Sequence, residues 1–154
     1  MSDPILVGSL VGGRYRIARR LGAGGMGTVY VAVQEGLGRE VALKVVRRDL
    51  SGDERAVERF RREAMTLSQA HHPHIVSIHA VESSGDVVFF VMEYIDGETL
   101  GARLRRDGAL PADVSLRITQ EVAWALAHAH VRGVIRRDVK PDNILLQAGG
   151  DHAI

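Results

Sequence analysis

The chain of 154 residues contains no cysteine, which excludes disulfide bonds, thiolate metal sites and a thiol nucleophile. Aromatic residues are scarce, with three Phe, three Tyr and one Trp, so a core must consist mainly of aliphatic side chains. The net charge is only +1, which gives no electrostatic reason to expect a nucleic acid as partner. Apolar residues make up 45% and charged residues 25%, as in ordinary globular proteins, which excludes a disordered chain or a coiled coil.

Long hydrophobic runs are also missing. No stretch approaches the roughly 20 apolar residues that a membrane helix needs. Asp3 stands where a signal peptide carries positive charge, and Gly8 and Ser9 interrupt the apolar residues that follow. We therefore expect no membrane segment in this chain, no nucleic-acid partner and a cytoplasmic location.

The first half of the chain predicts a sheet. Alternating and β-branched residues predict five strands, at 15–21, 28–33, 40–47, 75–82 and 87–94. A capping box at Ser51–Glu54, followed by apolar residues at helical spacing, predicts one helix over 53–69. The length predicts one domain or a little more.

The second half predicts helices, a short one near 99–106 and a long one over 112–132 that begins after Pro111. The long helix has no charge between Val122 and Ala127, which is typical of a helix buried on every side. Few residues follow Arg132 to cover it. We therefore expect two lobes, the second incomplete, and interpret the chain as a fragment.

Glycine is abundant, with 17 residues, and residues 22–27 match the pattern G-x-G-x-x-G. A dinucleotide-binding turn is disfavoured because these glycines precede a strand rather than a helix. A Walker-type loop is disfavoured because no Lys-Ser or Lys-Thr pair follows them. Two alternatives remain: a hairpin whose backbone N–H groups approach phosphate oxygens, and a flexible hairpin without a ligand.

Lys44 lies within an apolar strand, where alternation places it on the same face as Ala42 and Val46. An ammonium group on such a face needs a partner. Glu63 is the candidate, because it lies on or beside the apolar stripe of the predicted helix. The alternative is two unrelated surface charges.

Asp138, Lys140 and Asn143 crowd into a turn between an apolar helix and an apolar strand. Such a turn can hold a carboxylate as proton acceptor, an ammonium for a developing phosphoryl charge and an amide oxygen for a metal ion. The alternative is a polar turn without chemistry, which does not explain why this set accompanies the glycine loop and Lys44.

Together these segments resemble the protein kinase family, in particular the bacterial serine/threonine kinases of eukaryotic type. Residues 21–30 (LGAGGMGTVY) resemble the family's glycine loop, residues 41–44 (VALK) its strand-three lysine motif, and residues 137–143 (RDVKPDN) its catalytic loop.

The resemblance covers residues 13–154 and implies an α+β, protein-kinase-like fold. This fold has a five-stranded antiparallel N-lobe with one helix, plus an incomplete, mainly helical C-lobe. The expected organisation is a flexible arm over 1–12, an N-lobe over 13–94, a hinge over 95–97 and a partial C-lobe over 98–154.

The resemblance also implies ATP and Mg²⁺ as cofactors. Gly22, Gly24 and Gly27 would cover the ATP phosphates, and Lys44, fixed by Glu63, would hold the α and β phosphates. The other implied nucleotide-binding residues are Leu21, the adenine-sandwiching Val29, Ala42 and Leu145, the gatekeeper Met92, and Glu93 and Ile95 through their backbone.

In the catalytic loop the resemblance implies that Asp138 accepts the proton of the substrate hydroxyl, Lys140 stabilises the transferring phosphoryl group and Asn143 binds Mg²⁺. The implied partners are ATP and proteins that carry serine or threonine. Lysine two residues after the aspartate is typical of the serine/threonine class.

Two departures lead us to expect weak or no activity from this chain alone. Arg136 stands where the family has histidine, and the sequence ends before any Asp-Phe-Gly motif, the family's main Mg²⁺ carboxylate. The alternative function is a pseudokinase-like module that binds nucleotide or a partner without catalysis. The histidines at 71, 72 and 74 share one loop, which in this family only joins a helix to a strand, so we expect no metal site there.

Overall fold

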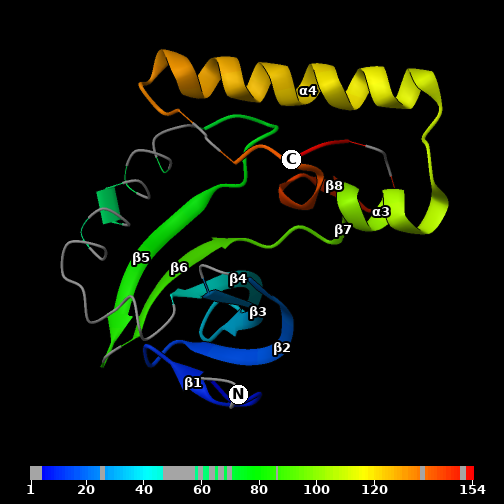
Figure 1. The fold of residues 1–154 in the computed structure, drawn as a ribbon. Helices are drawn as coiled ribbons and strands as arrows, with labels where there is room; N and C mark the ends of the chain where they lie inside the picture. Colours follow the sequence, from blue (N-terminus) through cyan, green and yellow to red (C-terminus); the bar gives the residue numbers. More distant parts are fainter. Residues whose placement is uncertain are drawn as a thin grey trace. The chain divides into compact units, whose positions relative to one another are not determined.

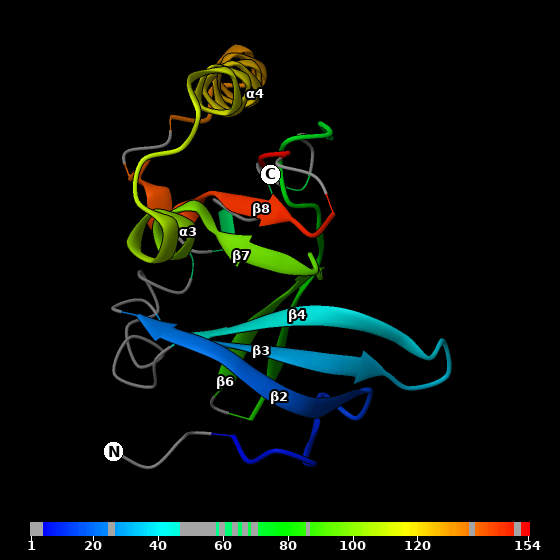
Figure 2. The same cartoon turned by 90° about the vertical axis from the view of Figure 1, so that its right-hand side faces the viewer.

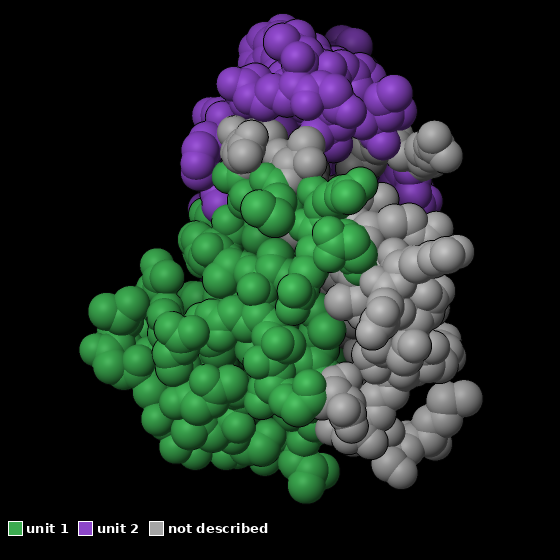
Figure 3. Space-filling view, turned by 90° about the vertical axis from the view of Figure 1, so that its left-hand side faces the viewer, with its two compact units in different colours: residues 1–68, 78–94 green, residues 69–77, 95–154 purple. Residues whose placement is uncertain are grey.

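The structure is a computed structural model that describes residues 5–24, 27–46, 58, 61–62, 65, 68, 71–85, 87–135, 138–149 and 152–154. The chain divides into two compact units, shown in different colours in Figure 3. Unit 1 comprises residues 1–68 and 78–94, and unit 2 comprises residues 69–77 and 95–154.

Unit 1 is built on a six-stranded antiparallel sheet. Its strands are β1 (Leu10–Val11), β2 (Tyr15–Gly24), β3 (Gly27–Gln34), β4 (Arg39–Val46), β5 (Ile78–Ser84) and β6 (Val87–Glu93). Their order across the sheet is β1-β2-β3-β4-β6-β5, and Figure 2 shows β2, β3 and β4 side by side.

The α+β architecture agrees with the prediction, but the predicted number of strands in this sheet, five, is wrong by one. The additional strand is β1, in which Leu10 pairs with Arg16 and Val11 with Tyr15 of β2. It lies in the segment expected to be a flexible arm. Two residues are too few to show the alternation from which a strand is predicted.

One face of the sheet carries the core of unit 1. Cross-strand partners share a face, so the register places Tyr30 of β3 with Leu43 of β4 and Val91 of β6. The buried cluster on this face consists of Ile5, Val11, Tyr15, Ile17, Tyr30, Ala32, Val41, Leu43, Val45, Phe89 and Val91. As expected from the shortage of aromatic residues, most of these side chains are aliphatic.

The helix predicted over 53–69 falls largely on residues outside the described part of the chain. Of its residues, 58, 61, 62, 65 and 68 are described, and all five are helical. Glu63, and with it the expected ion pair to Lys44, lies outside the described residues.

Unit 2 combines helices with a small sheet. Its elements are β7 (Gly97–Thr99), α3 (Leu100–Asp107), α4 (Ala112–Val131), a 3₁₀ helix (Pro141–Asn143) and β8 (Leu145–Gln147). Figures 1 and 2 show α3 beside the antiparallel pair β7 and β8.

Helix α4 buries one stripe of side chains. The buried residues Ile118, Glu121, Ala125 and Ala129 recur at intervals of three or four, which places them on one helical face. Ile118 packs in a cluster with Leu146 and Ala153, which follow much later in the sequence. In the part of the chain that the structure describes, no helix is both long and apolar enough to cross a membrane.

Candidate functional site

The glycine-rich segment forms the hairpin between β2 and β3. Gly24 pairs with Gly27, and Gly22 pairs with Val29. Gly27 has φ of +147°, a backbone conformation that other residues rarely adopt. A Cβ added to Gly22 would meet no atom of the described chain within 4 Å, so its backbone faces open space. Leu21, at the start of this segment, is 45% exposed.

Four of the site residues predicted in β3, β4 and β6 share the face of the sheet opposite to the core: Val29, Ala42, Lys44 and Met92. Val29 pairs with Lys44, and Lys44 pairs with Phe90. One step along, Ala42 pairs with Met92. Ala42 is buried and Lys44 is half-buried. The register thus gathers one ammonium group and a row of apolar side chains on a surface next to the glycine hairpin. Glu93, the last residue of β6, is exposed.

In unit 2 the two residues predicted as catalytic, Asp138 and Lys140, lie together with the predicted metal ligand Asn143. The Asn143 side-chain amide Nδ2 donates to the backbone oxygen of Asp138 at 2.9 Å and to its carboxylate Oδ2 at 3.0 Å. The Lys140 ammonium lies 3.1 Å from the same Oδ2. Both charged side chains are about half exposed, at 52% for Lys140 and 55% for Asp138. The turn therefore presents a carboxylate, an ammonium and an oriented amide to solvent.

The 3₁₀ helix and β8 hold this turn in place. The backbone N–H of Asn143 donates to the Lys140 carbonyl at 2.9 Å, and the Asp142 carboxylate pairs with Arg105 of α3 at 2.9 Å. Leu145, predicted to contact adenine, begins β8 and pairs with Thr99 of β7. Leu145 and Ile95 are both half-buried.

Glycine is required at one position of this small sheet. A Cβ on Gly97 would lie 2.0 Å from the backbone oxygen of Leu146, which is closer than atoms approach in proteins. Strands β7 and β8 therefore pair here only because Gly97 has no side chain.

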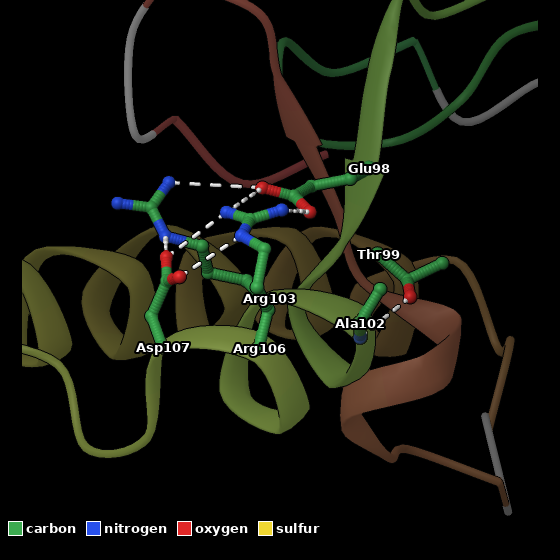
Figure 4. A network of polar contacts seen from close by, with 6 residues as sticks. All are labelled: Glu98, Thr99, Ala102, Arg103, Arg106 and Asp107. Carbon is green, nitrogen blue, oxygen red and sulfur yellow. Dashed lines mark hydrogen bonds and ion pairs between the residues drawn. The ribbon is translucent and has the colours of Figure 1, made fainter.

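A network of charges links the middle and the end of α3 to β7 (Figure 4). The Glu98 carboxylate lies 2.5 Å and 2.9 Å from two guanidinium nitrogens of Arg106, and 3.8 Å from Arg103. The hydrogen bond from Arg106 holds the pKa of Glu98 below its ordinary value, and the same guanidinium lowers the pKa of Asp107. These carboxylates are thus neutralised by arginines of their own unit.

Thr99 caps the start of this helix. Its hydroxyl oxygen accepts a hydrogen bond from the backbone N–H of Ala102 at 3.0 Å, as an N-cap residue does. The short helix predicted near 99–106 therefore begins directly after Thr99, whose side chain caps it.

Two features of unit 2 escaped prediction. Glu121 is only 5% exposed, yet its carboxylate accepts the backbone N–H of Ala153 at 2.7 Å and lies 2.7 Å from Nδ1 of His152. The available signal was an acidic residue directly before the charge-free stretch of a helix.

The second feature is a cluster of three histidines. The rings of His72 and His128 lie with centroids 4.9 Å apart, and those of His72 and His74 lie 5.5 Å apart. Sequence spacing gave no reason to bring residue 128 to the loop. Among the described residues, no group of three or more His, Cys, Asp or Glu side chains is arranged to hold a metal ion.

Comparison with families of known proteins places these residues in context. The family model for the protein kinase domain matches residues 15–154. The chain is 42% identical over 147 residues to the serine/threonine-protein kinase PrkC of Bacillus subtilis, which covers 96% of this chain and 23% of PrkC. It is 41% identical over 149 residues to PknA of Mycobacterium tuberculosis, which covers 94% of this chain and 35% of PknA.

The fold is likewise similar to that of solved kinases. The crystal structure of the Mycobacterium tuberculosis PknI kinase domain superposes with a TM-score of 0.83 and 33% identity, over 97% of this chain and 60% of that one. A double mutant of the same kinase domain superposes with a TM-score of 0.87 and 31% identity, over 97% of this chain and 61% of that one.

The chain thus spans about a quarter to a third of the length of these curated relatives, and about three fifths of the solved kinase domains. The match nevertheless includes the glycine hairpin, the strand that carries Lys44 and the turn that carries Asp138. On this match and these identities, the chain belongs to the protein kinase domain family, and its named relatives are bacterial serine/threonine-protein kinases.

Proposed function

We propose that this chain binds ATP and takes part in transferring its γ-phosphoryl group to serine or threonine hydroxyls of proteins. The observation that carries the proposal is the cluster of Asp138, Lys140 and Asn143, held together by contacts of 2.9 to 3.1 Å. A proton acceptor and a cation at one turn are the groups that phosphoryl transfer requires.

Unit 1 supplies the proposed nucleotide-binding surface. The open backbone at Gly22 allows phosphate oxygens to approach N–H groups without meeting a side chain. Lys44 contributes the positive charge for the α and β phosphates. Ala42 and Met92, paired beside it, supply the apolar surface against which adenine packs.

Adenine also needs polar recognition, for which we propose the backbone groups of Glu93 and Ile95. Leu21, Val29 and Leu145 are the other apolar side chains proposed to contact the base. Gly24 and Gly27 are proposed to cover the phosphates together with Gly22, and Glu63 to fix Lys44.

In the transfer itself, the substrate hydroxyl oxygen forms a bond to the γ-phosphorus while the bond from that phosphorus to the bridging oxygen breaks, which releases ADP. Asp138 accepts the hydroxyl proton. The Lys140 ammonium faces the charge on the transferring oxygens. It lies 3.1 Å from the Asp138 carboxylate, so the cation and the proton acceptor stand side by side in the turn.

Mg²⁺ fits Asn143. Because the amide nitrogen of Asn143 donates to two oxygens of Asp138, the amide is oriented with its carbonyl oxygen as the remaining polar atom. Mg²⁺ prefers oxygen ligands and completes its shell with phosphates and water rather than with an all-protein cage. When bound, the ion neutralises phosphate charge.

A phosphotransfer assay tests the proposal. The purified chain is incubated with labelled ATP, Mg²⁺ and a generic basic protein, beside the variant Asp138→Asn. We expect a low signal from the parent, because Arg136 replaces the family's histidine and no Asp-Phe-Gly motif is present in this sequence. The signal should vanish in the variant. Equal blanks from both would favour a binding module without catalysis.

The cellular setting of this proposal is the cytoplasm, where ATP is available. A chain without cysteine has no need of an oxidising compartment.

A further inference from the structure

A contact in unit 1 joins two segments that are 75 residues apart in the sequence. The Arg19 guanidinium Nη2 donates to the phenol oxygen of Tyr94 at 2.5 Å. Its central carbon lies 5.5 Å from the centroid of the same ring, within the range of a cation–π interaction. The Arg19 side chain therefore contacts both the hydroxyl group and the ring of Tyr94.

The backbone of β2 is shaped so that Arg19 takes part in this contact. Ile17 and Arg19 pair with consecutive residues of β3, so Ala18 is the extra residue of a β-bulge. Without the bulge, Arg19 would oppose Tyr30 on the core face. With it, Arg19 opposes Val31 and faces the other side of the sheet.

That other side is the proposed nucleotide-binding surface. Val31 pairs with Ala42, and Ala42 pairs with Met92, so Arg19 belongs to the same cross-strand row. Tyr94 lies two residues beyond Met92. The contact thus reaches from β2 to the end of β6, although β3 and β4 lie between these strands in the sheet.

We propose that Arg19 is a positioning residue for adenine binding, which acts by holding Tyr94 in place. Tyr94 stands between Glu93 and Ile95, whose backbone groups are the proposed hydrogen-bonding partners of the base. The inference rests on the proposed function. Arg19 itself does not contact the nucleotide. It restricts the backbone of residues 93–95, which is proposed to hydrogen-bond adenine.

The test measures dissociation constants of the full chain for ATP and for adenosine by calorimetric titration. We expect Arg19→Ala to raise both dissociation constants by the same factor, about three- to tenfold, which corresponds to the loss of one exposed charge-assisted contact. By contrast, Lys44→Met should weaken ATP much more than adenosine, because it acts on the phosphates. Arg16→Ala is the matched control: Arg16 is on the same strand and pairs with Glu35 at 2.5 Å, and its loss should change neither constant.

A double-mutant cycle with Tyr94→Phe shows whether the two side chains act together. If they do, the double variant binds ATP no more weakly than Arg19→Ala alone. Unchanged affinity in Arg19→Ala, or additive losses in the double variant, would overturn the inference while leaving the proposed function intact. A parent chain that binds neither ATP nor adenosine would overturn both.

Discussion

At the scale of single residues, Gly22 and Gly97 are glycines for different physical reasons. Gly97 lies where a Cβ would overlap the backbone oxygen of Leu146, whereas Gly22 faces open space among the described residues. The fold therefore requires glycine at position 97, whereas the proposed ligand requires it at position 22, and an experiment can distinguish the two requirements.

We predict opposite results for alanine at these two positions. Gly97→Ala should lower the stability of the chain by about 1–3 kcal/mol, because β7 and β8 must move apart. Gly22→Ala should change stability by less than about 0.5 kcal/mol, since the added methyl meets no atom of the described residues within 4 Å. It should weaken ATP binding, because the methyl occupies the space needed by phosphate. Chemical denaturation and ATP titration of both variants measure the two effects; a destabilised Gly22→Ala variant would contradict the separation.

Single residues differ in how far the sequence predicts them. Asp138, Lys140 and Asn143 are close in sequence, so a turn alone brings them together. Arg19 and Tyr94 are far apart, and their contact depends on a bulge at Ala18 that leaves no periodic signal. Glu121 is similar, because its partners Ala153 and His152 follow about 30 residues later.

At the scale of elements, the loop over 71–77 contacts the end of α4 through histidines. Nδ1 of His72 accepts the backbone N–H of His74 at 3.2 Å, which requires that nitrogen to carry no proton. His74 Nδ1 in turn lies 2.7 Å from the carbonyl of Ala153. Arg132 places a guanidinium nitrogen 3.3 Å from Nδ1 of His128, the ring against His72. The cluster therefore places an uncharged His72 ring against His128, whose own neighbour Arg132 is a permanent cation.

This arrangement predicts a loss of stability in mild acid. Burial lowers the pKa of His72, and His128, His74 and Arg132 lower it further. The unfolded chain then binds the proton more tightly than the folded chain. The stability that the uncharged His72 contributes is therefore complete above the ordinary pKa of 6.5, and it is lost as pH falls below that value. Thermal melting from pH 7.5 to 5.5 should show this decline.

The variant His72→Asn isolates the effect, because the asparagine oxygen can accept the same N–H without titrating. Its melting temperature should fall less over this pH range than that of the parent. The melting temperature of His71→Asn, a change at the exposed neighbouring position, should fall as much as that of the parent. An equal decline in His72→Asn and the parent would exclude His72 as the source.

A second loss of stability is expected at lower pH from Glu121. Burial raises the pKa of this carboxyl, but the Ala153 N–H and His152 outweigh burial and hold the pKa below its ordinary 4.5. Stability from Glu121 is thus present above 4.5 and is lost as pH falls through the lower, folded value. Glu121→Gln should remove this second decline and leave the His72 step in place.

At the scale of the whole molecule, the change from sheet to helix along the chain follows from the change in hydrophobic period. The strands β2 to β6 and helices α3 and α4 lie where period-two and helical patterns predict them, with boundaries shifted by up to three residues. The short strand β8 follows the turn at 138–143, where an apolar strand is expected, but β1 and β7 were not located, because they have only two and three residues. Their positions depend on distant partners rather than on local pattern.

The described chain also exposes apolar side chains along α4. Leu116 is 71% exposed, Trp124 53% and Val131 86%. We predict that the isolated chain binds an apolar dye or self-associates, because such surface is unfavourable in water. Replacing Leu116 and Val131 by lysine should reduce dye fluorescence without loss of helix by circular dichroism. Leu37→Lys, at another position that is 67% exposed, is the control. A compact, sharply melting monomer that binds no dye would contradict this prediction.

The proposed function depends most on the binding of ATP to the sheet face that carries Lys44. The direct measurement is the shift in melting temperature on addition of Mg²⁺ and ATP, for the parent, for Lys44→Met and for Arg39→Met at the other end of β4. We predict a rise for the parent and for Arg39→Met, and none for Lys44→Met. An equal rise in all three chains would show that the nucleotide binds elsewhere, and would contradict the proposed role of Lys44.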